Sequence, residues 1–432
     1  MPSWHSWLGS RPAIKGPIAR GTIRTTFVLG LRLLVQAGTL LLVARLLGPD
    51  QFGAFAGIAA LAVLLGAVAS FGTNVVLLGE VSKAPGRRVQ VLQYAVPTTL
   101  LCGGALLIAY LLICRLALRD TGVPVTVLLA IGISETWLQP LFGLPAAEQL
   151  ALGRIARSQL LATLPLLLRL AAATVVFLLR PEAPLTAYAY GYLAASVAAL
   201  VFASTTLPAP WPNPKHWRLP IRKELRDAAG YAALNLTAST PAELDKTLAA
   251  KLLPLPAAGL YAAGARVIGA ATLPVIAMLL SALPRLFREG QNQPQRTGRL
   301  LRWIFAATLA YSLALAVLLW FIAPAFVWLF GAKYAGIEHT IHWLCLAVPG
   351  MALRVAAGGI LMAFGRPWMR VGFELTGLIV LIVAAVFMTT RFGTTGMPLA
   401  LASSEWVMAA IGVWLLLMAW DGRTKVPVST PV

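Results

Sequence analysis

The chain has 432 residues, of which 59% are hydrophobic and only 12% are charged, and its mean hydropathy is +0.80. This composition excludes an ordinary soluble globular domain. The net charge of +20 does not indicate a nucleic-acid-binding protein, because no basic face is interleaved with aromatic side chains. The three cysteines, Cys102, Cys114 and Cys345, lie far apart and form neither a disulfide framework nor a metal motif, so packing is their expected role.

Apolar runs long enough to cross roughly 30 Å of hydrocarbon recur along the whole chain. We predict about twelve of them. Their centres lie near residues 35, 65, 102, 132, 169, 195, 240, 270, 315, 350, 380 and 408. They are expected to be helices, because lipid offers no hydrogen-bond partner to an unpaired backbone group. The sequence therefore predicts an all-α polytopic membrane protein.

The chain begins with a basic arm, residues 1–24, in which Trp4 and Trp7 lie among lysines and arginines. This arm either lies on the inner membrane surface or forms a disordered tail. It does not have the pattern of a cleavable signal, because the first apolar run is long enough to span a membrane and lacks a small-residue cleavage site.

Basic residues gather in alternate short loops. The rich set comprises the N-terminal arm, residues 83–88, 154–157, 215–226, 285–302, 366–370 and 423–425, and the poor set comprises residues 115–119, 180, 333 and 391. Cytoplasmic loops carry the excess of Lys and Arg. We therefore expect both termini on the cytoplasmic side, which is consistent with an even number of spans.

An internal repeat relates the two halves of the chain. Residues 44–56 resemble residues 250–262, and a second echo relates residues 151–154 to residues 363–366 at a similar offset. The aligned pairs are Arg45 with Lys251, Gly53 with Gly259 and Phe55 with Tyr261. In a membrane protein, duplicated halves are typical of a transporter that rocks about a site at their interface.

A proline-rich segment marks the boundary between the halves. Residues 207–216 contain four prolines, at every second position from Pro208 to Pro214, and prolines cannot continue a helix, so the chain is expected to be extended there. Residues 219–227 are basic and amphipathic and are expected to skim the cytoplasmic surface. The sequence thus predicts an N-terminal lobe over residues 25–206, a cytoplasmic linker over 207–227, a C-terminal lobe over 228–420 and a cytoplasmic tail over 421–432.

Polar side chains within the spans are costly and are therefore candidates for function. The candidates for a substrate-binding cavity are Arg32, Gln36, Arg169, Asn235, Arg266 and Arg354. Several arginines around one cavity suit an anionic substrate, because guanidinium binds phosphate through two parallel hydrogen bonds and does not lose its proton. The alternatives are that Arg32 snorkels to lipid headgroups and that Arg169 and Arg354 form structural pairs with acids on neighbouring helices.

Buried acids are the candidates for coupling transport to an ion or a proton. They are Glu135, Glu243, Asp245 and Glu374, with Glu405 in the last span. The alternative for Asp245 is a local pair with Lys246. His339 and His342 are three residues apart, but no further ligand accompanies them, so no metal site is expected.

No enzyme signature is found. The chain has no glycine-rich phosphate loop with a Lys-Ser/Thr pair and no nucleophile elbow, so neither an ATP motor nor a cofactor is expected. A membrane-embedded glycosyltransferase or polysaccharide polymerase stays an alternative, although such enzymes usually carry a large external loop and the loops here are short.

The first two predicted spans, with Ala44-Arg-Leu-Leu-Gly-Pro-Asp-Gln-Phe-Gly53 and Phe71-Gly-Thr-Asn74, resemble the opening of polysaccharide-biosynthesis flippases. These flippases belong to the multidrug/oligosaccharidyl-lipid/polysaccharide exporter superfamily. Residues 244–253, 259–263, 283–286, 330–334 and 363–366 are similar to the family's second-half pattern. The chain departs from it at Pro254-Leu-Pro256, where the family commonly has a glycine-containing turn.

This resemblance implies a flippase that moves an undecaprenyl-diphosphate-linked oligosaccharide across a bacterial cytoplasmic membrane for O-antigen, capsule or exopolysaccharide synthesis. It implies two pseudo-symmetric six-helix bundles around a central V-shaped cavity, with Arg32 and Arg266 at the positions that make the family's cavity cationic. The implied partners are the lipid-linked glycan, the bilayer, a polysaccharide polymerase and glycosyltransferases. Drug and cation antiporters of the same superfamily are the other alternative, and cavity arginines argue against them.

Overall fold

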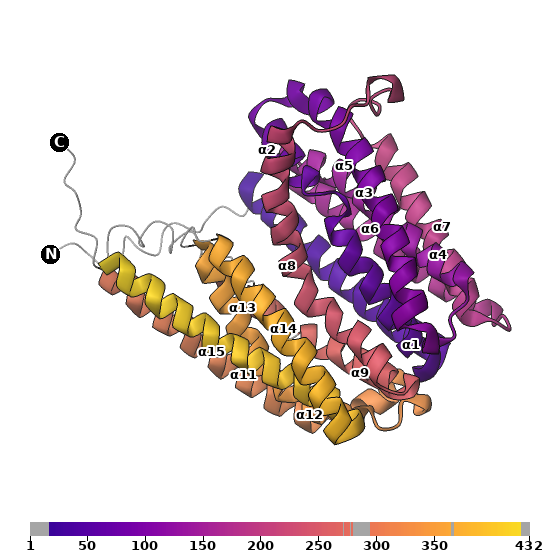
Figure 1. Ribbon diagram of the computed structural model, residues 1–432, viewed down its shortest axis with the longest axis vertical. Coiled ribbons are helices and arrows are strands. Elements are labelled where there is room, and N and C mark those ends of the chain that lie inside the picture. Colours follow the sequence, from indigo (N-terminus) through magenta and orange to yellow (C-terminus); the bar gives the residue numbers. More distant parts are fainter. Residues whose placement is uncertain (1–16, 271, 277, 280–293, 364–366, 425–432) are drawn as a thin grey trace, which may run out of the picture.

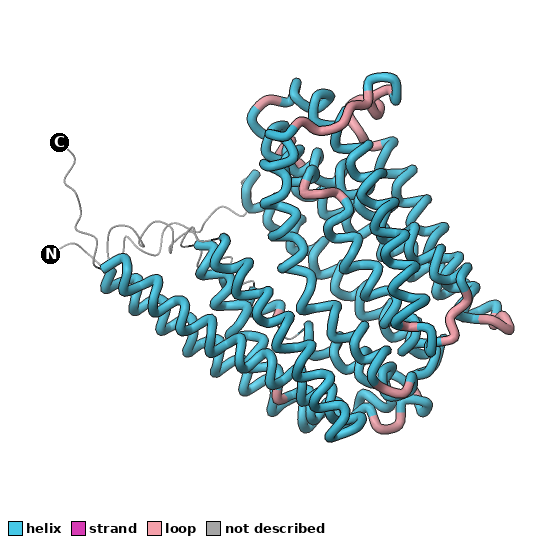
Figure 2. The backbone as a smooth tube through the Cα atoms, in the orientation of Figure 1, coloured by secondary structure: helices cyan, strands magenta, loops and turns pink. Residues whose placement is uncertain are grey.

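The computed structural model describes residues 17–270, 272–276, 278–279, 294–363 and 367–424. The expectations for the arm before residue 17, for the tail after residue 424 and for the motif at 283–286 concern residues outside these ranges. Within them, all regular structure is helical, and Figure 2 shows that the loops are short and lie at the ends of the helices. An all-helical protein is what lipid requires of a polytopic chain.

Within the described residues, most helices follow one another after short connections, and the longest connection joins α7 to α8. In chain order they are α1 (Pro17–Ala69), α2 (Thr73–Lys83), α3 (Arg88–Ala117), α4 (Val125–Ile133), the π-helical turn η4 (Ser134–Leu138), α5 (Gln139–Ala151), α6 (Ile155–Leu179), α7 (Pro184–Thr205), α8 (Arg222–Leu252), α9 (Leu255–Ala270), α11 (Pro294–Phe330), α12 (Ile337–Cys345), α13 (Ala347–Ala363), α14 (Pro367–Phe392) and α15 (Gly396–Thr424). Short 3-10 turns follow α3 (Arg119–Thr121) and α11 (Ala332–Tyr334).

Each of the twelve predicted centres falls in a helix, but the number of qualifying spans is lower. The described residues hold eight helices long and apolar enough to cross a membrane, or nine if the pair α12 and α13, bent by 46°, counts as one span. Two of the eight runs, 30–69 and 369–418, each contain two predicted centres, and α8 is not among them. The chain is therefore a multi-pass membrane protein, and the count of twelve stays a prediction.

Two breaks divide these long runs. In α1 the helix is interrupted at Gly48, whose φ of 68° is left-handed, directly before Pro49. Glycine adopts this conformation at no steric cost, and proline is well suited to start the next helix. Between α14 and α15 a 3-10 turn over Gly393–Thr395 separates two helices that pack against each other. Each break thus lies within a run that is apolar on both sides of it.

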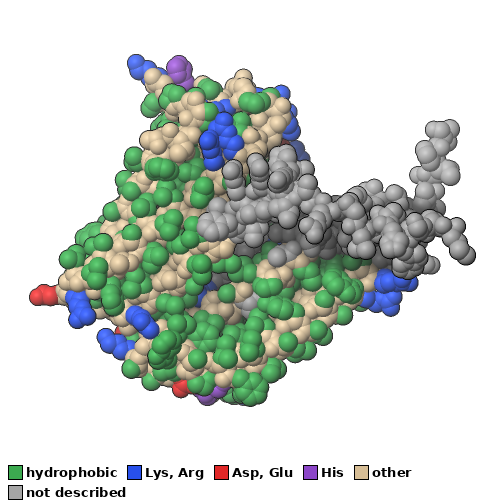
Figure 3. All heavy atoms as spheres, turned by 180° about the vertical axis from the view of Figure 1, so that it is seen from behind, with side chains coloured by type: hydrophobic (Ala, Val, Ile, Leu, Met, Phe, Trp, Pro, Cys, Tyr) green, Lys and Arg blue, Asp and Glu red, His purple; other side chains and the backbone are tan. Residues whose placement is uncertain are grey.

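The helices form two groups. Figure 1 shows α1 to α7 on one side and α11 to α15 on the other, with α8 and α9 between them. Both α8 and α9 pack against α1, while α8 also packs against α14 and α9 against α12. The groups lie together where α1, α9 and α12 meet, and their helices diverge toward the opposite end. Viewed from behind, Figure 3 shows a recess in the middle of the surface with Lys or Arg atoms inside it.

The repeated motifs meet each other at the junction of the two groups. A Cβ on Gly259 would collide with the carbonyl oxygen of Pro49, and a Cβ on Gly53 would collide with that of Leu255. The two contacts are reciprocal, because the repeat aligns Gly53 with Gly259 and Pro49 with Leu255. This is the arrangement expected around a pseudo-two-fold axis. The glycines are therefore required for the close approach of α1 and α9.

The proline-rich segment is held against the N-terminal group. Arg88 forms a buried ion pair with Glu148 and donates hydrogen bonds to the carbonyls of Ala209, at 2.7 Å, and Pro210, at 3.2 Å. Outside the spans, the Arg218 guanidinium lies 2.6 Å from Glu224 and lowers the pKa of that carboxyl. The segment is mostly non-helical, with one 3-10 turn at Pro214–His216, and α8 then begins at Arg222.

Candidate substrate-binding site

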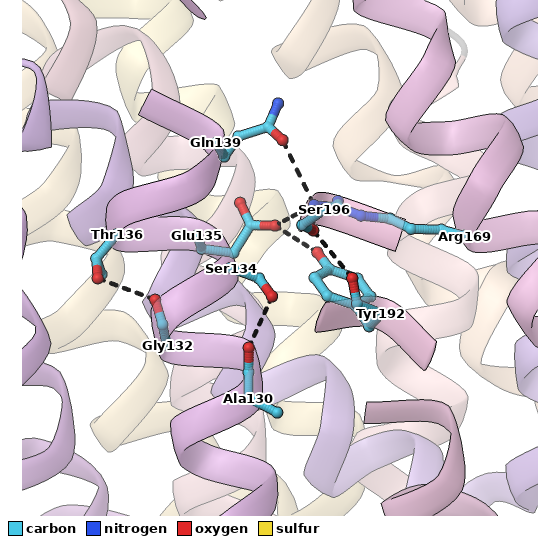
Figure 4. Close-up of polar contacts among 9 residues, drawn as sticks. All are labelled: Ala130, Gly132, Ser134, Glu135, Thr136, Gln139, Arg169, Tyr192 and Ser196. Carbon is cyan, nitrogen blue, oxygen red and sulfur yellow. Dashed lines mark hydrogen bonds and ion pairs between the residues drawn. The ribbon is translucent and has the colours of Figure 1, made fainter. Parts of the chain in front are cut away.

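The first polar cluster lies inside the N-terminal group (Figure 4). The Arg169 guanidinium of α6 donates to the carboxylate of Glu135 at 2.8 Å and to the hydroxyl of Ser196 at 3.3 Å. It also stacks over the Tyr192 ring, 3.8 Å from the centroid, and the Tyr192 hydroxyl donates to the same oxygen of Glu135. Arg169 and Glu135 are 9% and 4% exposed. Charge and hydrogen bonds are largely satisfied within the cluster, which indicates a structural role.

A π-helical turn places Glu135 in this cluster. The turn η4 interrupts the span formed by α4 and α5, and its Ser134 and Thr136 hydroxyls donate to carbonyls four residues earlier, at 2.7 and 2.9 Å. A Cβ on Gly66 would collide with the Glu135 carbonyl oxygen, so glycine lets α1 approach this turn. The extra residue of a π-turn shifts the register of the side chains that follow.

The second cluster lies in the C-terminal group. Arg354 of α13 is held between two carboxylates, 2.6 Å from Glu405 of α15 and 3.1 Å from Glu374 of α14. Both acids are buried, and the side chain of Arg354 is 12% exposed. One guanidinium thus faces two carboxylates. A small cavity adjoins the cluster and is lined in addition by Ser404.

The third cluster joins α8 and α9. Asp245 is buried, lies 3.2 Å from the Lys246 ammonium and accepts a hydrogen bond from the Tyr261 hydroxyl at 2.9 Å. Glu243, two residues earlier, has only long ion pairs within the described residues, 3.8 Å from Lys246 and 3.9 Å from Arg266. The buried Oε2 of Glu243 accepts no hydrogen bond from the described residues.

Arg266 differs from the other two arginines of the clusters. Its side chain is 39% exposed, and its one ion pair among the described residues is the 3.9 Å contact with Glu243. Arg266 belongs to α9, which lies between the two groups and packs against α1 and α12. Its guanidinium keeps most of its five donors available to a ligand.

The remaining candidates lie on the first helices of the two halves. In α1, Arg32 is half-buried and Gln36 is exposed, and within the described part of the chain neither has an ion-pair or hydrogen-bond partner. In α8, Asn235 is half-buried. The structure therefore divides the predicted arginines into two classes. Arg169 and Arg354 form close ion pairs within the helix groups, whereas Arg32 and Arg266 have no close ion pair among the described residues.

Sequence reasoning missed the neutral partners of these charges. Tyr192, Ser196 and Tyr261 lie in apolar runs, where a hydroxyl residue gives no sign of its neighbour. The ion pair between Arg88 and Glu148 was also missed, since both lie at span ends where charges are ordinary. Among the residues that the structure describes, no group of three or more His, Cys, Asp and Glu side chains is arranged to hold a metal ion.

Comparison with solved structures identifies the fold. The structure matches a multidrug resistance MATE family transporter of the MOP superfamily in an inward-facing conformation, with a TM-score of 0.76, 13% identity, and coverage of 92% of this chain and 96% of that one. It also matches the lipid II flippase MurJ in an inward closed conformation, with a TM-score of 0.73, 12% identity and coverage of 93% and 90%. No curated protein matches the chain.

A third match is a MOP superfamily transporter from Pyrococcus furiosus, described as having a binding pocket of reverse polarity, with a TM-score of 0.64, 14% identity and coverage of 94% and 95%. The model of the polysaccharide biosynthesis protein family matches residues 18–289. This is a transporter family rather than an enzyme family. The chain therefore belongs to the polysaccharide biosynthesis protein family and has the fold of the MOP superfamily.

Proposed function

We propose that this protein is a flippase that moves an undecaprenyl-diphosphate-linked oligosaccharide across the bacterial cytoplasmic membrane for surface polysaccharide synthesis. The observation that carries the proposal is Arg266, an arginine at the junction of the two helix groups that is 39% exposed and has only one long ion pair in the described residues. The family match and the fold shared with a lipid II flippase also support a role in moving a lipid-linked glycan.

In this proposal the two groups are six-helix lobes, residues 25–206 and 228–420, around a V-shaped cavity, with the linker 207–227 on the cytoplasmic side. The diphosphate needs compensating charge in a medium of low dielectric, because an unpaired charge cannot enter it cheaply. Arg266 and Arg32 supply that charge, and Gln36 and Asn235 offer hydrogen bonds to the phosphate and sugar. Arg169 and Arg354 support the lobes and do not contact the substrate.

Glu243 fits the role of counterion to Arg266 while no substrate is bound. Its carboxylate lies near both Arg266 and Lys246 without a close hydrogen bond to either. An incoming diphosphate would replace it as the counterion of Arg266. Among the predicted coupling acids, Glu135 and Asp245 each have a close basic partner, whereas Glu374 shares Arg354 with Glu405. Two carboxylates that share one close guanidinium, with Arg370 near Glu374 on the same helix, favour a bound proton or cation more than a one-to-one pair does, so we propose Glu374 and Glu405 for coupling.

The class of transporter can be tested by complementation. In a strain whose own lipid-linked glycan flippase is deleted, expression of this chain should restore surface polysaccharide. A drug or cation antiporter of the same superfamily would instead confer resistance to cationic compounds and leave the glycan inside. Drug resistance without any surface glycan, in strains that supply several different lipid-linked glycans, would overturn the flippase proposal.

The proposed topology has its own test. Residues 80–90, 148–158 and 207–227 should face the cytoplasm. Single cysteines placed there, in a variant without the three native cysteines, should resist a membrane-impermeant thiol reagent in intact cells and react after permeabilisation. A cysteine at Asp120, in the basic-poor set of loops, is the matched control and should react in intact cells. If cysteines in any two of these segments are labelled in intact cells, the proposed orientation of the protein in the membrane is wrong.

A further inference from the structure

Two basic residues that the internal repeat aligns each contact the other half of the chain. Arg45 of α1 donates from Nε to the carbonyl of Leu329, at 3.0 Å, and from its terminal nitrogen to that of Trp328, at 3.2 Å. Lys251, near the end of α8, lies 3.1 Å from the carboxylate of Asp120. The first contact ties α1 to the end of α11, and the second ties α8 to the turn that follows α3.

The two contacts are counterparts under the repeat. If the two parts of α1 are counted as separate spans, α3 is the third predicted span of the first half. In the same way, α11 is the third predicted span of the second half, after α8 and α9. Each is followed by a 3-10 turn, Arg119–Thr121 and Ala332–Tyr334. In each half, the basic residue of the repeated motif therefore contacts the end of the third span of the other half. Arg45 contacts the end of α11, and Lys251 contacts the turn after α3. Such a crossed pair is what a two-fold axis between the halves produces.

The same end of the molecule is closed by packing between the contacts. The buried Tyr334 hydroxyl donates to the carbonyl of Ala44 at 3.0 Å, and the Lys333 side chain lies 3.6 Å from the Cβ position of Gly48. Ala44 is fully buried. The reciprocal glycine contact of α1 with α9 belongs to the same junction. Parting the two halves at this end removes Tyr334 from Ala44, so a cysteine at this position should then become easier for a reagent to reach.

We propose that the Arg45 and Lys251 contacts form a pseudo-symmetric latch that holds the two halves together at the end where α3 and α11 finish, and that this latch opens in each transport cycle. This proposal rests on one part of the proposed function, namely that the two halves move relative to each other during transport. Breaking either arm raises the population of the state that is open at this end, because each arm stabilises only the closed one.

The two arms are unequal. The side chains of Lys251 and Asp120 are 43% and 85% exposed, and exposed ion pairs contribute little. Arg45 is also exposed, but it binds two carbonyls of the last turn of α11, where the helix leaves its carbonyls unpaired and carries partial negative charge. Hydrogen bonds to a charged group are the stronger kind. Arg45 is therefore the main arm, and the Asp120 arm should weaken further at high salt.

The latch can be measured by the reactivity of a cysteine at Ala44. In a variant in which Cys102, Cys114 and Cys345 are alanine, Ala44→Cys should react slowly with a soluble thiol reagent in detergent. Adding Arg45→Ala should raise the rate about tenfold or more, from the hydrogen bonds lost. Asp120→Ala should raise it about twofold to fivefold. Arg115→Ala removes the same charge near the end of α3 without a contact between the halves, and should leave the rate unchanged.

The outcomes decide the proposal without any substrate. If Arg45→Ala and Asp120→Ala both leave the rate at that of the Arg115→Ala control, the latch is wrong, whatever the protein transports. Asp120 is so exposed that its replacement carries no risk to folding, so the second arm is tested even if Arg45→Ala fails to fold. In cells, a reversible thiol cross-linker between cysteines at positions 120 and 251 should stop export, and its cleavage should restore it. Export by the cross-linked protein would show that this end need not open.

Discussion

Replacing Arg266 with alanine should reduce glycan export by about tenfold to a hundredfold while leaving the protein folded in the membrane. A hydrogen bond to a charged group contributes about 1.5–3 kcal/mol, and each 1.4 kcal/mol or so corresponds to about tenfold in rate. Little stability should be lost, because the side chain is 39% exposed and its one described ion pair spans 3.9 Å. Lysine should rescue export only in part, since an ammonium cannot bind phosphate in the two-pronged way of guanidinium.

The measurement is surface polysaccharide in cells whose only flippase is the variant, with the amount of protein in the membrane determined alongside. Arg391→Ala is a matched control, because Arg391 is an exposed arginine of the same half whose recorded contact is with the Phe387 ring. Arg32→Ala should reduce export less than Arg266→Ala, since Arg32 has the snorkelling alternative. Normal export by the Arg32→Ala/Arg266→Ala double variant would show that these two arginines do not form the anion site.

Replacing Arg169 with alanine should lower the stability of the protein, in contrast to the Arg266 variant, which should lose export while staying stable. Removing one partner of a buried ion pair costs about 3–5 kcal/mol, because the other charge is left uncompensated. Glu135, 4% exposed, would keep only the hydrogen bond from Tyr192. We therefore expect a lower melting temperature in detergent and less protein in the membrane. The neutral double variant Arg169→Leu/Glu135→Gln should recover most of that loss, since no unpaired charge remains.

Export separates a structural role from a substrate-binding role. If Arg169 only supports the N-terminal group, the double variant should export in proportion to its amount. A folded, abundant double variant without export would place Arg169, Glu135 or both in the transport cycle itself. Arg354→Ala should be still more destabilising than Arg169→Ala, because it removes the guanidinium that contacts both Glu374 and Glu405.

The sequence by itself determined the membrane class, the helical content and the place of each predicted span centre, because the cost of exposing backbone groups to lipid depends on composition and length alone. It also determined the repeat, and with it the counterparts Arg45 and Lys251. Separate predicted centres lie on either side of the breaks at Gly48 and at Gly393–Thr395, but each pair counts as one long apolar run by length and composition, so the number of spans stays a prediction.

Only the tertiary structure decided which charged side chains are open to a ligand. Arg169, Arg266 and Arg354 look alike in the sequence, each an arginine in an apolar run. The structure places two of them against carboxylates on other helices and leaves Arg266 half-open at the junction of the two halves. The physical reason is that an ion pair depends on distances between helices far apart in the sequence, such as α4–α5 with α6, whereas hydropathy is a property of each segment alone.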